Sequence, residues 1–403
     1  MRTFRTYARG VACAAVVGAS VVACGGSNST APPPTSSTAG LSSSSPGPIS
    51  TTTAPTASAT PTATPFTETP GPAGLTRLTT ISGQITPKSV VASGDGIVVA
   101  DNMIYSHTVT VYDRDFKLLK TIPDSIDAAA FGVAGHPGTS HGGPVEAAFT
   151  PDKKYFYVSN YSMYGAGWGA EGHDTCSPGS HFGTSTVYRI NRATLAIDQV
   201  IPVGVVPKFL EVTPDGTKVL VSNWCSYAVS VIDTATAKQT QLIPVGAYPR
   251  GIAVTADSKT AYIAIMGGSN LIKMDLTTYA KTSIPAGGRS PRHLILDPTG
   301  RYVYITLNGS GTVTKLDTTT NQIVATRATG SDPRSMAMSP DGQFLYVVNY
   351  LSSSMTKIRA SDFTIVQTVA TNQHPIGITV DAGTGRVWLA DYGGTIEVFA
   401  DRR

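Results

Sequence analysis

The stretch Ser339-Pro-Asp-Gly-Gln-Phe-Leu-Tyr-Val-Val-Asn349 decides the fold. Proline, aspartate and glycine favour a tight turn, and the aromatic and β-branched run after them favours a strand. The same pattern recurs from Leu75 onward, and related strands are Tyr157 to Asn160, Val219 to Asn223 and Trp388 to Asp391. With 40 Gly and 27 Pro among 403 residues and only 14% charged residues, the composition excludes coiled coils and long helical bundles. The sequence therefore predicts short antiparallel strands joined by tight turns.

A proline before the first strand of each unit gives the repeat its period. Five of these prolines lie 42 residues apart, and two earlier ones have longer spacings: Pro87, Pro144, Pro207, Pro249, Pro291, Pro333 and Pro375. Four strands per unit, repeated seven times, predict an all-β fold: a seven-bladed β-propeller of four-stranded antiparallel blades.

The last unit lacks a strand. Only 28 residues follow Pro375, enough for three strands, whereas Leu75 to Ile81 precede the first unit as an additional strand. We expect this N-terminal strand to pair into the last blade and close the ring, because closure removes exposed sheet edges.

The first 23 residues have the pattern of an export signal. Three arginines precede the apolar run Val11 to Ala23, and these 13 residues are too few to span a bilayer as a helix. The sequence Val21-Val22-Ala23-Cys24 resembles a bacterial lipobox, which predicts acylation of Cys24. An ordinary secretory signal cleaved near Ala23 is the alternative. Both interpretations export the chain, and the first makes it an extracytoplasmic protein lipid-anchored to the bacterial cell membrane.

Residues 24–74 form a predicted tether between the anchor and a propeller domain at 75–403. Residues 25–74 hold 22 Ser or Thr, ten prolines and one charged residue, Glu68, so they cannot form a core. Whether the tether carries O-glycans stays open.

Two cysteines remain in the predicted propeller, Cys176 and Cys225. In an exported chain such a pair favours a disulfide, and two buried free thiols are the alternative. The repeat places Cys176 in a long loop of the second blade and Cys225 in the corresponding turn of the third. Both lie on the face that carries the crossovers between blades, which we call the upper face.

Basic residues follow five of the seven crossover prolines. They are Lys88, Lys208, Arg250, Arg292 and Arg334, and the other two positions hold Val145 and Ile376. Because the first strand of each blade lines the central channel, these cations should surround its upper mouth and favour an anionic ligand. The alternative is that they brace the crossovers. Neutralising Arg250, Arg292 and Arg334 together should abolish binding with unchanged thermal stability in the first case, and should lower stability in the second.

Histidines and aromatic residues also gather in the predicted upper-face loops. His293 follows Arg292, and Trp168 lies in the insert of the second blade, so both are candidate ligand contacts. Histidines of the two inserts, near Ala128 and Tyr161, could bind a metal with Glu146, Glu171 and Asp174, serve in acid–base chemistry, or be solvated loop residues. No catalytic residue and no metal ligand can be assigned, and we expect no cofactor. The absence of a Cys-x-x-Cys-His motif excludes a covalently attached c-type haem.

The Tyr-Val-x-Asn strands after Pro-Asp-Gly turns resemble the YVTN β-propeller family, and the resemblance covers residues 75–403. It implies an exported seven-bladed propeller in a group of mostly binding or surface proteins, with distant lactonase and oxidoreductase relatives. Two long inserts, and Ile265-Met266 where Asn is expected, depart from the plain repeat.

The leading functional hypothesis is a binding or scaffold module whose upper face recognises an envelope ligand. That ligand would be an anionic small molecule, a glycan or a protein, and we expect the propeller to be monomeric. A lactonase-like hydrolase with a His and Arg site at the channel mouth is the second hypothesis. A weak binder of single-stranded nucleic acid is the third, disfavoured because the mature chain carries a charge of only about +1 after Arg2, Arg5 and Arg9 are removed from the formal +4.

Overall fold

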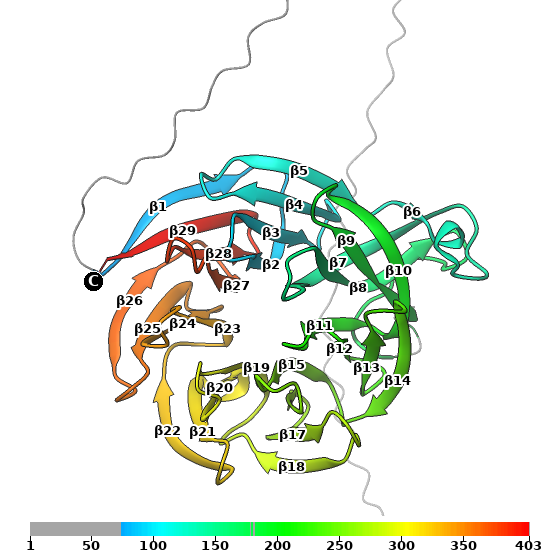
Figure 1. Ribbon diagram of the computed structural model, residues 1–403. Helices are drawn as coiled ribbons and strands as arrows, with labels where there is room; N and C mark the ends of the chain where they lie inside the picture. The colour runs from blue at the N-terminus through cyan, green and yellow to red at the C-terminus, as the bar shows by residue number, and fades with distance from the viewer. Residues whose placement is uncertain (1–73, 178, 180–181, 403) are drawn as a thin grey trace, which may run out of the picture. The chain divides into compact units, whose positions relative to one another are not determined.

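The computed structural model describes residues 74–177, 179 and 182–402, so the signal, Cys24 and nearly all of the tether lie outside the described residues. Seven antiparallel sheets surround a central channel, which confirms the predicted seven-bladed β-propeller (Figure 1). The first strand of each blade lies innermost, and neighbouring first strands contact one another.

The blades follow the chain in order, each running outward from its first strand. Blade 1 comprises β2 (Pro87–Ala92), β3 (Ile97–Asn102), β4 (Thr108–Asp113) and β5 (Leu118–Pro123). Blade 2 comprises β7 (Thr139–Phe149), β8 (Tyr155–Gly165), β9 (Thr184–Asn191) and β10 (Ala196–Val205). Blade 3 comprises β11 (Pro207–Val212), β12 (Lys218–Asn223), β13 (Ala228–Asp233) and β14 (Lys238–Pro244). Blades 4 and 5 comprise β15 (Pro249–Val254), β16 (Thr260–Ile265), β17 (Asn270–Asp275) and β18 (Lys281–Pro285); and β19 (Pro291–Leu296), β20 (Tyr302–Leu307), β21 (Thr312–Asp317) and β22 (Gln322–Ala328). Blades 6 and 7 comprise β23 (Pro333–Met338), β24 (Phe344–Asn349), β25 (Ser354–Arg359) and β26 (Ile365–Ala370); and β27 (Pro375–Val380), β28 (Val387–Asp391), β29 (Thr395–Arg402) and β1 (Gly74–Ser82).

The N-terminal strand closes the ring as the repeat count predicts. β1 pairs antiparallel with β29, and Leu75 lies opposite Asp401. The side chain of Arg77 on β1 also forms an ion pair with buried Glu397 of β29 at 2.6 Å. The pairing of β1 with β29 completes the seventh blade as a four-stranded sheet and ties the N-terminal strand of the propeller to its last blade.

Acidic and amide residues at the ends of third strands fix the next turns. The carboxylate of Asp113 accepts hydrogen bonds from the backbone N–H groups of Asp115 and Lys117, both at 2.9 Å. Asp275 accepts from the N–H of Thr277 at 2.9 Å in the same way. These side chains therefore stabilise the turns that follow the third strands.

Apolar side chains pack between adjacent blades and hold them together. Trp388 of β28 is fully buried, and its ring packs against Tyr112 of β4 and Phe116 of the turn that follows. These contacts join the last blade to the first, so side-chain packing supports the same closure as the β1–β29 ladder.

The two inserts are partly strands, where the sequence predicts loops over 124–143 and 161–184. β7 and β8 extend beyond the common strand length, and their ladder reaches Ser140 opposite Gly165. The short strand β6 (Ile126–Asp127) pairs with β7, and a 3₁₀ helix covers Ala128–Phe131. A further 3₁₀ helix covers Asn308–Ser310. Within the described residues, no helix has the length and apolar character needed to span a membrane.

Candidate functional site

The five basic residues that follow crossover prolines converge at the upper end of the channel. Together with Ile376 they line a cavity of about 150 Å³, and we call Lys88, Lys208, Arg250, Arg292 and Arg334 the cation ring. The first strands β2, β11, β15, β19 and β23 position them, because each side chain lies at the second residue of its strand. Upper-face turns complete the lining with Met103, Asp174, Trp224, Tyr350 and Tyr392.

The cation ring is buried but incompletely neutralised. Lys88, Lys208, Arg250 and Arg292 are only 5–6% exposed. Within the described part of the chain, the side chains of Lys88 and Arg292 have no ion-pair or hydrogen-bond partner, and Arg250 donates one long hydrogen bond, at 3.4 Å, to the carbonyl of Lys208. Such an arrangement is costly unless a negative group completes it, because a buried charge loses its hydration.

Two members of the cation ring do have carboxylate partners. The Lys208 ammonium contacts Asp174 at 2.7 Å, and the Arg334 guanidinium contacts Asp332 at 2.7 Å. Arg334 also lies over the ring of Tyr350, 4.0 Å from its centroid, in a cation–π contact. These partners fix the positions of Lys208 and Arg334, whereas Arg292 and Lys88 remain available to a ligand.

Burial and mutual repulsion disfavour the charged forms of the ring. Desolvation, followed by the positive charges of neighbours, lowers the pKa of Lys88 and of Arg292 well below their ordinary values. Desolvation is also the main cause that lowers the pKa of Lys208 to about 8 and that of Arg250 to about 10. A bound anion would reverse this effect, since it favours the protonated form of every neighbouring cation.

Below the cation ring, the channel is lined by carboxylic acids. Glu146 of β7, Glu211 of β11 and His293 of β19 line a second cavity of about 250 Å³, which we call the acidic chamber. Desolvation and then the charge of Glu146 raise the pKa of Glu211 to about 8, and desolvation raises that of Glu146. Glu211 is therefore protonated at neutral pH, so the acidic chamber only partly offsets the positive charge above it.

The raised pKa of Glu211 predicts the pH dependence of a Glu211→Gln variant. Folded Glu211 titrates near pH 8 and unfolded Glu211 near 4.5, so wild-type stability falls between these values while the unfolded chain alone releases its proton. Below about pH 4.5 the variant and wild type should have the same free energy of unfolding. Between about pH 4.5 and 8 the variant should become more stable than wild type by up to ~1.4 kcal/mol per pH unit, and above pH 8 the difference should stay constant. Urea unfolding between pH 4 and 9 measures this. The exposed Asp115→Asn is the control, and a pH-independent difference between Glu211→Gln and wild type would contradict the assignment.

His293 lies below the cation ring, where it lines the acidic chamber, and it does not line the upper cavity. Its Nδ1 accepts a hydrogen bond from the N–H of Met336 at 3.4 Å, and its ring meets Phe209 edge-on. Desolvation and the neighbouring Arg292 lower the pKa of His293 to about 3. A neutral imidazole with so low a pKa is a poor general base at neutral pH.

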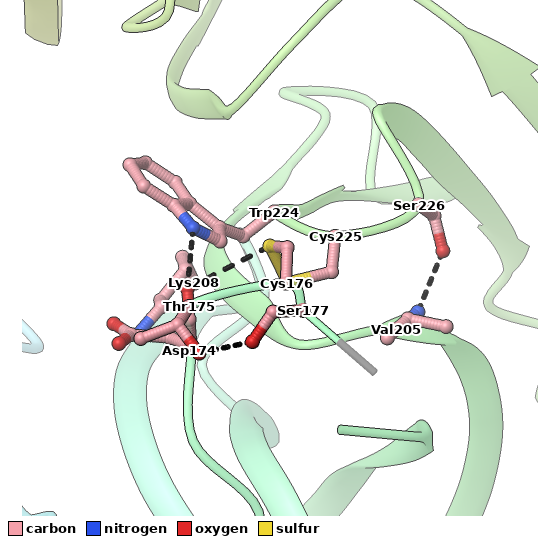
Figure 2. Close-up of a disulfide and its surroundings, with 9 residues drawn as sticks. All are labelled: Asp174, Thr175, Cys176, Ser177, Val205, Lys208, Trp224, Cys225 and Ser226. Carbon is pink, nitrogen blue, oxygen red and sulfur yellow. Dashed lines mark hydrogen bonds and ion pairs between the residues drawn. A yellow bond between two sulfur atoms is a disulfide. The ribbon is translucent and has the colours of Figure 1, made fainter. Parts of the chain in front are cut away.

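The predicted disulfide between Cys176 and Cys225 is confirmed, with the two Cα atoms 5.3 Å apart (Figure 2). It ties the insert of blade 2 to the β12–β13 turn of blade 3. The neighbouring Trp224 donates its indole N–H to the backbone carbonyl of Asp174 at 3.0 Å. Because Asp174 is also the partner of Lys208, the bridge and the tryptophan together hold a carboxylate at the cation ring.

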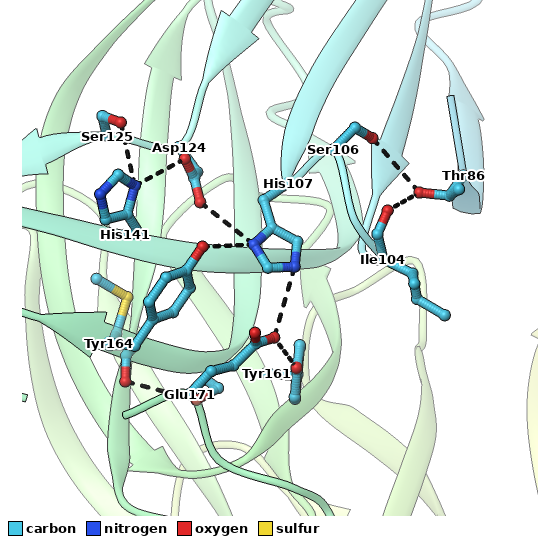
Figure 3. A network of polar contacts seen from close by, with 12 residues as sticks. Thr86, Ile104, Ser106, His107, Asp124, Ser125, His141, Tyr161, Tyr164 and Glu171 are labelled. Atoms are coloured by element: carbon cyan, nitrogen blue, oxygen red, sulfur yellow. Dashed lines mark hydrogen bonds and ion pairs between the residues drawn. The ribbon is translucent and has the colours of Figure 1, made fainter. Parts of the chain in front are cut away.

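A separate polar cluster joins the insert to blade 1 (Figure 3). His107 contacts the Tyr164 hydroxyl at 2.5 Å, Glu171 at 3.5 Å and Asp124 at 3.8 Å, and His141 contacts Asp124 at 3.3 Å. Among the described residues, no group of three or more His, Cys, Asp or Glu side chains has the geometry of a metal site.

The same cluster does not form a hydrolase triad. Ser125 and Asp124 both contact Nδ1 of His141, at 3.1 and 3.3 Å. In a Ser-His-Asp triad, the serine and the acid occupy opposite ring nitrogens. The contacts of His107 and His141 instead fasten the insert to the body of the propeller.

Trp168 does not line the cavity of the cation ring. Its indole stacks on His136, with ring centroids 3.6 Å apart, and packs against the core between blades 1 and 2. Its candidate role as a ligand contact therefore has no support in the geometry. Glu146 likewise lines the acidic chamber, whereas Asp174 lines the cavity of the cation ring.

Sequence reasoning missed Glu211 and Asp101, and it did not connect Asp174 with the cation ring. Asp101, whose pKa desolvation raises to about 7, accepts a hydrogen bond from Ser89 at 2.6 Å. A charged residue at the next-to-last place of a channel-lining strand, as Glu211 is in β11, was the available signal. No corresponding signal for Asp174 exists in the sequence, because the position of this residue depends on how a long insert folds.

The comparisons with known proteins support the fold. The family model described as the cytochrome D1 heme domain matches residues 290–388. Among solved structures, hydrazine synthase of Kuenenia stuttgartiensis superposes with a TM-score of 0.62 at 18% identity, over 79% of this chain and 96% of that chain. Comparison with curated proteins finds no match. What these proteins share with this chain is the propeller fold, and the YVTN resemblance stays a prediction.

The residues of the channel do not fit a haem. The upper cavity holds about 150 Å³ and the acidic chamber about 250 Å³, whereas sites for ligands of drug size or larger occupy ~300–1,000 Å³. His293, which lines the acidic chamber, is packed against Phe209 and uses Nδ1 for a backbone hydrogen bond. We therefore derive no function through a haem from the partial family match.

Proposed function

We propose that this protein is a binding module for an oxyanion-bearing ligand, by which we mean one with a carboxylate, sulfate or phosphate group. One observation carries the proposal: five basic side chains, four of them buried, surround a small cavity. Arginine and lysine are the side chains that bind oxyanions by charge-assisted hydrogen bonds. The propeller fold is consistent with a binding or scaffold role.

The charge balance supports an anionic ligand. Lys208 and Arg334 each contact a carboxylate, Asp174 and Asp332 respectively, whereas Lys88, Arg250 and Arg292 have no ion-pair partner among the described residues, so positive charge is in excess at the cavity. An excess of this kind is unfavourable in a buried site, and an anion would neutralise it. The site thus stores an unfavourable energy that ligand binding would release.

Aromatic rings beside the cavity suggest where the rest of the ligand lies. Trp224 packs on Tyr248 with centroids 4.7 Å apart, and Tyr350 lies edge-on to Tyr392. Aromatic faces beside an anion site suit an acidic glycan or another ligand with an apolar surface. We therefore place the oxyanion in the cavity and the remainder of the ligand against these rings.

The two other hypotheses receive less support. A lactonase-like hydrolase needs a base of suitable pKa at the channel mouth, and His293, with a pKa near 3, is below the cation ring. A single-stranded nucleic acid needs exposed cations along its backbone, whereas Lys88, Lys208, Arg250 and Arg292 are buried around a small cavity.

Titration calorimetry with sulfate and with acetate, in buffers low in chloride, tests the proposal. Both probes keep one charge state from pH 7 to 9.5, but Lys208 loses its proton near pH 8. Affinity should fall about tenfold or more over this range, because one charge-assisted contact is worth ~1.5–3 kcal/mol. Lys208→Gln should bind more weakly at pH 7 and depend less on pH. No heat from either probe at pH 7 would refute the proposed function.

We further propose that the module is a lipoprotein on the outer side of the bacterial cell membrane. The lipobox-like sequence Val21-Val22-Ala23-Cys24 motivates this. In a bacterial host that acylates lipoproteins, Cys24→Ser should move the protein from the membrane fraction to the soluble extracytoplasmic fraction. Two acyl chains anchor a protein stably to a membrane, and the variant would lack them. Detergent-dependent partitioning that is unchanged in Cys24→Ser would contradict the lipid anchor.

A further inference from the structure

Among the described residues that line the upper cavity, one is acidic, and this residue is Asp174. Its carboxylate contacts the Lys208 ammonium at 2.7 Å, and Arg250 also acts on it electrostatically. Burial tends to raise the pKa of Asp174, but the charges of Lys208 and Arg250 outweigh burial and lower it. The carboxylate is thus ionised and already makes a contact that an oxyanion ligand would make.

Lys208 and Asp174 differ sharply in exposure. The Lys208 side chain is 7% exposed, while that of Asp174 is 53% exposed. The carboxylate therefore lies on the solvent side of a buried cation, at the entrance to the cavity. A ligand that enters from the upper face meets Asp174 before it meets Lys208.

The loop that carries Asp174 is held in place by dedicated contacts (Figure 2). The Asp174 carbonyl accepts the indole N–H of Trp224, and two residues later Cys176 is bonded to Cys225. Both anchors belong to the β12–β13 turn of blade 3, although the loop comes from blade 2. Asp332, by contrast, reaches Arg334 from only two residues away. If the role of Asp174 were only to neutralise Lys208, a carboxylate near Lys208 in the sequence would be enough, as Asp332 is for Arg334. A cross-linked loop from another blade would not be needed.

We propose that Asp174 is an internal competitor: its carboxylate occupies the position on Lys208 that the oxyanion group of the ligand takes when it binds. This inference rests on the proposed function and adds that the ligand displaces a tethered carboxylate. The ligand group is therefore of carboxylate size, compatible with a cavity of about 150 Å³. Carboxylate, sulfate and phosphate groups share this chemistry, and acetate and sulfate serve as probes of the two shapes.

The test compares wild type, Asp174→Asn and Asp198→Asn by calorimetric titration with sulfate and with acetate at pH 7. Asp198 is the matched control, because it pairs with Arg189 on the outer strands of blade 2 and does not line the cavity. We expect Asp174→Asn to bind at least about tenfold more tightly, since the amide neither repels the probe nor competes strongly for Lys208. Asp198→Asn should stay within about twofold of wild type.

The outcomes separate the two proposals. Wild-type binding with unchanged affinity in Asp174→Asn would overturn the internal competitor and leave the oxyanion site standing. Weaker binding in Asp174→Asn would also overturn it, because Asp174 would then position Lys208 for the ligand. Binding by neither protein would overturn both proposals. A tenfold gain for acetate alone, or for sulfate alone, would support the competitor and identify the ligand group as planar or tetrahedral.

Discussion

Arg292→Met will make the propeller more stable and will weaken its binding of sulfate. The Arg292 guanidinium is buried, lies among other cations, and has no ion-pair partner within the described residues. Replacement of buried ion pairs by apolar side chains of similar volume is often neutral or stabilising by ~1–4 kcal/mol, and Arg292 has no ion-pair contact to lose within the part of the chain that the structure describes. The free energy of unfolding, measured with urea at pH 7 without sulfate, should rise within this range.

The same substitution removes a charged donor from the proposed site. Sulfate affinity should fall about tenfold to hundredfold, because a hydrogen bond to a charged group is worth ~1.5–3 kcal/mol. Added sulfate should stabilise wild type and have less effect on Arg292→Met, as ligand linkage requires.

Arg359→Met is the control, because Arg359 is about half exposed and pairs with Asp362 on the outer part of blade 6. It should change stability by no more than ~0.5 kcal/mol. Loss of stability in Arg292→Met would show that the cation ring braces the crossovers. From the sequence we expect unchanged stability if the ring residues serve recognition and lower stability if they brace the crossovers, and the burial of Arg292 changes the first of these expectations to a gain.

The double variant Cys176→Ser/Cys225→Ser will lose about 4 kcal/mol of unfolding free energy. The bridge joins residues 49 positions apart, and a loop of this size restricts the unfolded chain by about that amount in the chain-entropy treatment. Denaturant unfolding under oxidising conditions measures the loss, and reduced wild type should match the variant. Unchanged stability would show that the bridge adds little to the fold.

The disulfide variant also bears on the role of Asp174. Release of the loop should let the carboxylate leave Lys208 more readily, so sulfate should bind more tightly to the double variant than to wild type at temperatures where both are folded. The double cysteine variant should therefore be less stable but bind sulfate more tightly, whereas Arg292→Met should be more stable but bind sulfate more weakly.

Repetition made the fold predictable. The 42-residue period of the crossover prolines gave the number of blades, and the strand before the first unit gave the closure that β1 and β29 form. Local preferences were enough here, because each turn and strand repeats the same short pattern and each blade packs only against its neighbours. The same reasoning placed five cations at one mouth, since equivalent positions of a repeat lie on a circle.

The sequence alone predicted the blades, the closing strand and the convergence of the cation ring, and it favoured a bridge between Cys176 and Cys225 over two free thiols. Only the tertiary structure decided that four of these cations are buried, that Glu211 is protonated beneath them, and that Asp174 rests on Lys208. Repeat periodicity fixes where a strand residue lies around the channel, but burial and charge balance depend on side chains from several blades at once. The position of Asp174 depends further on an insert that has no counterpart in the repeat, so its place follows from the contacts with Trp224 and Cys225 rather than from any local pattern.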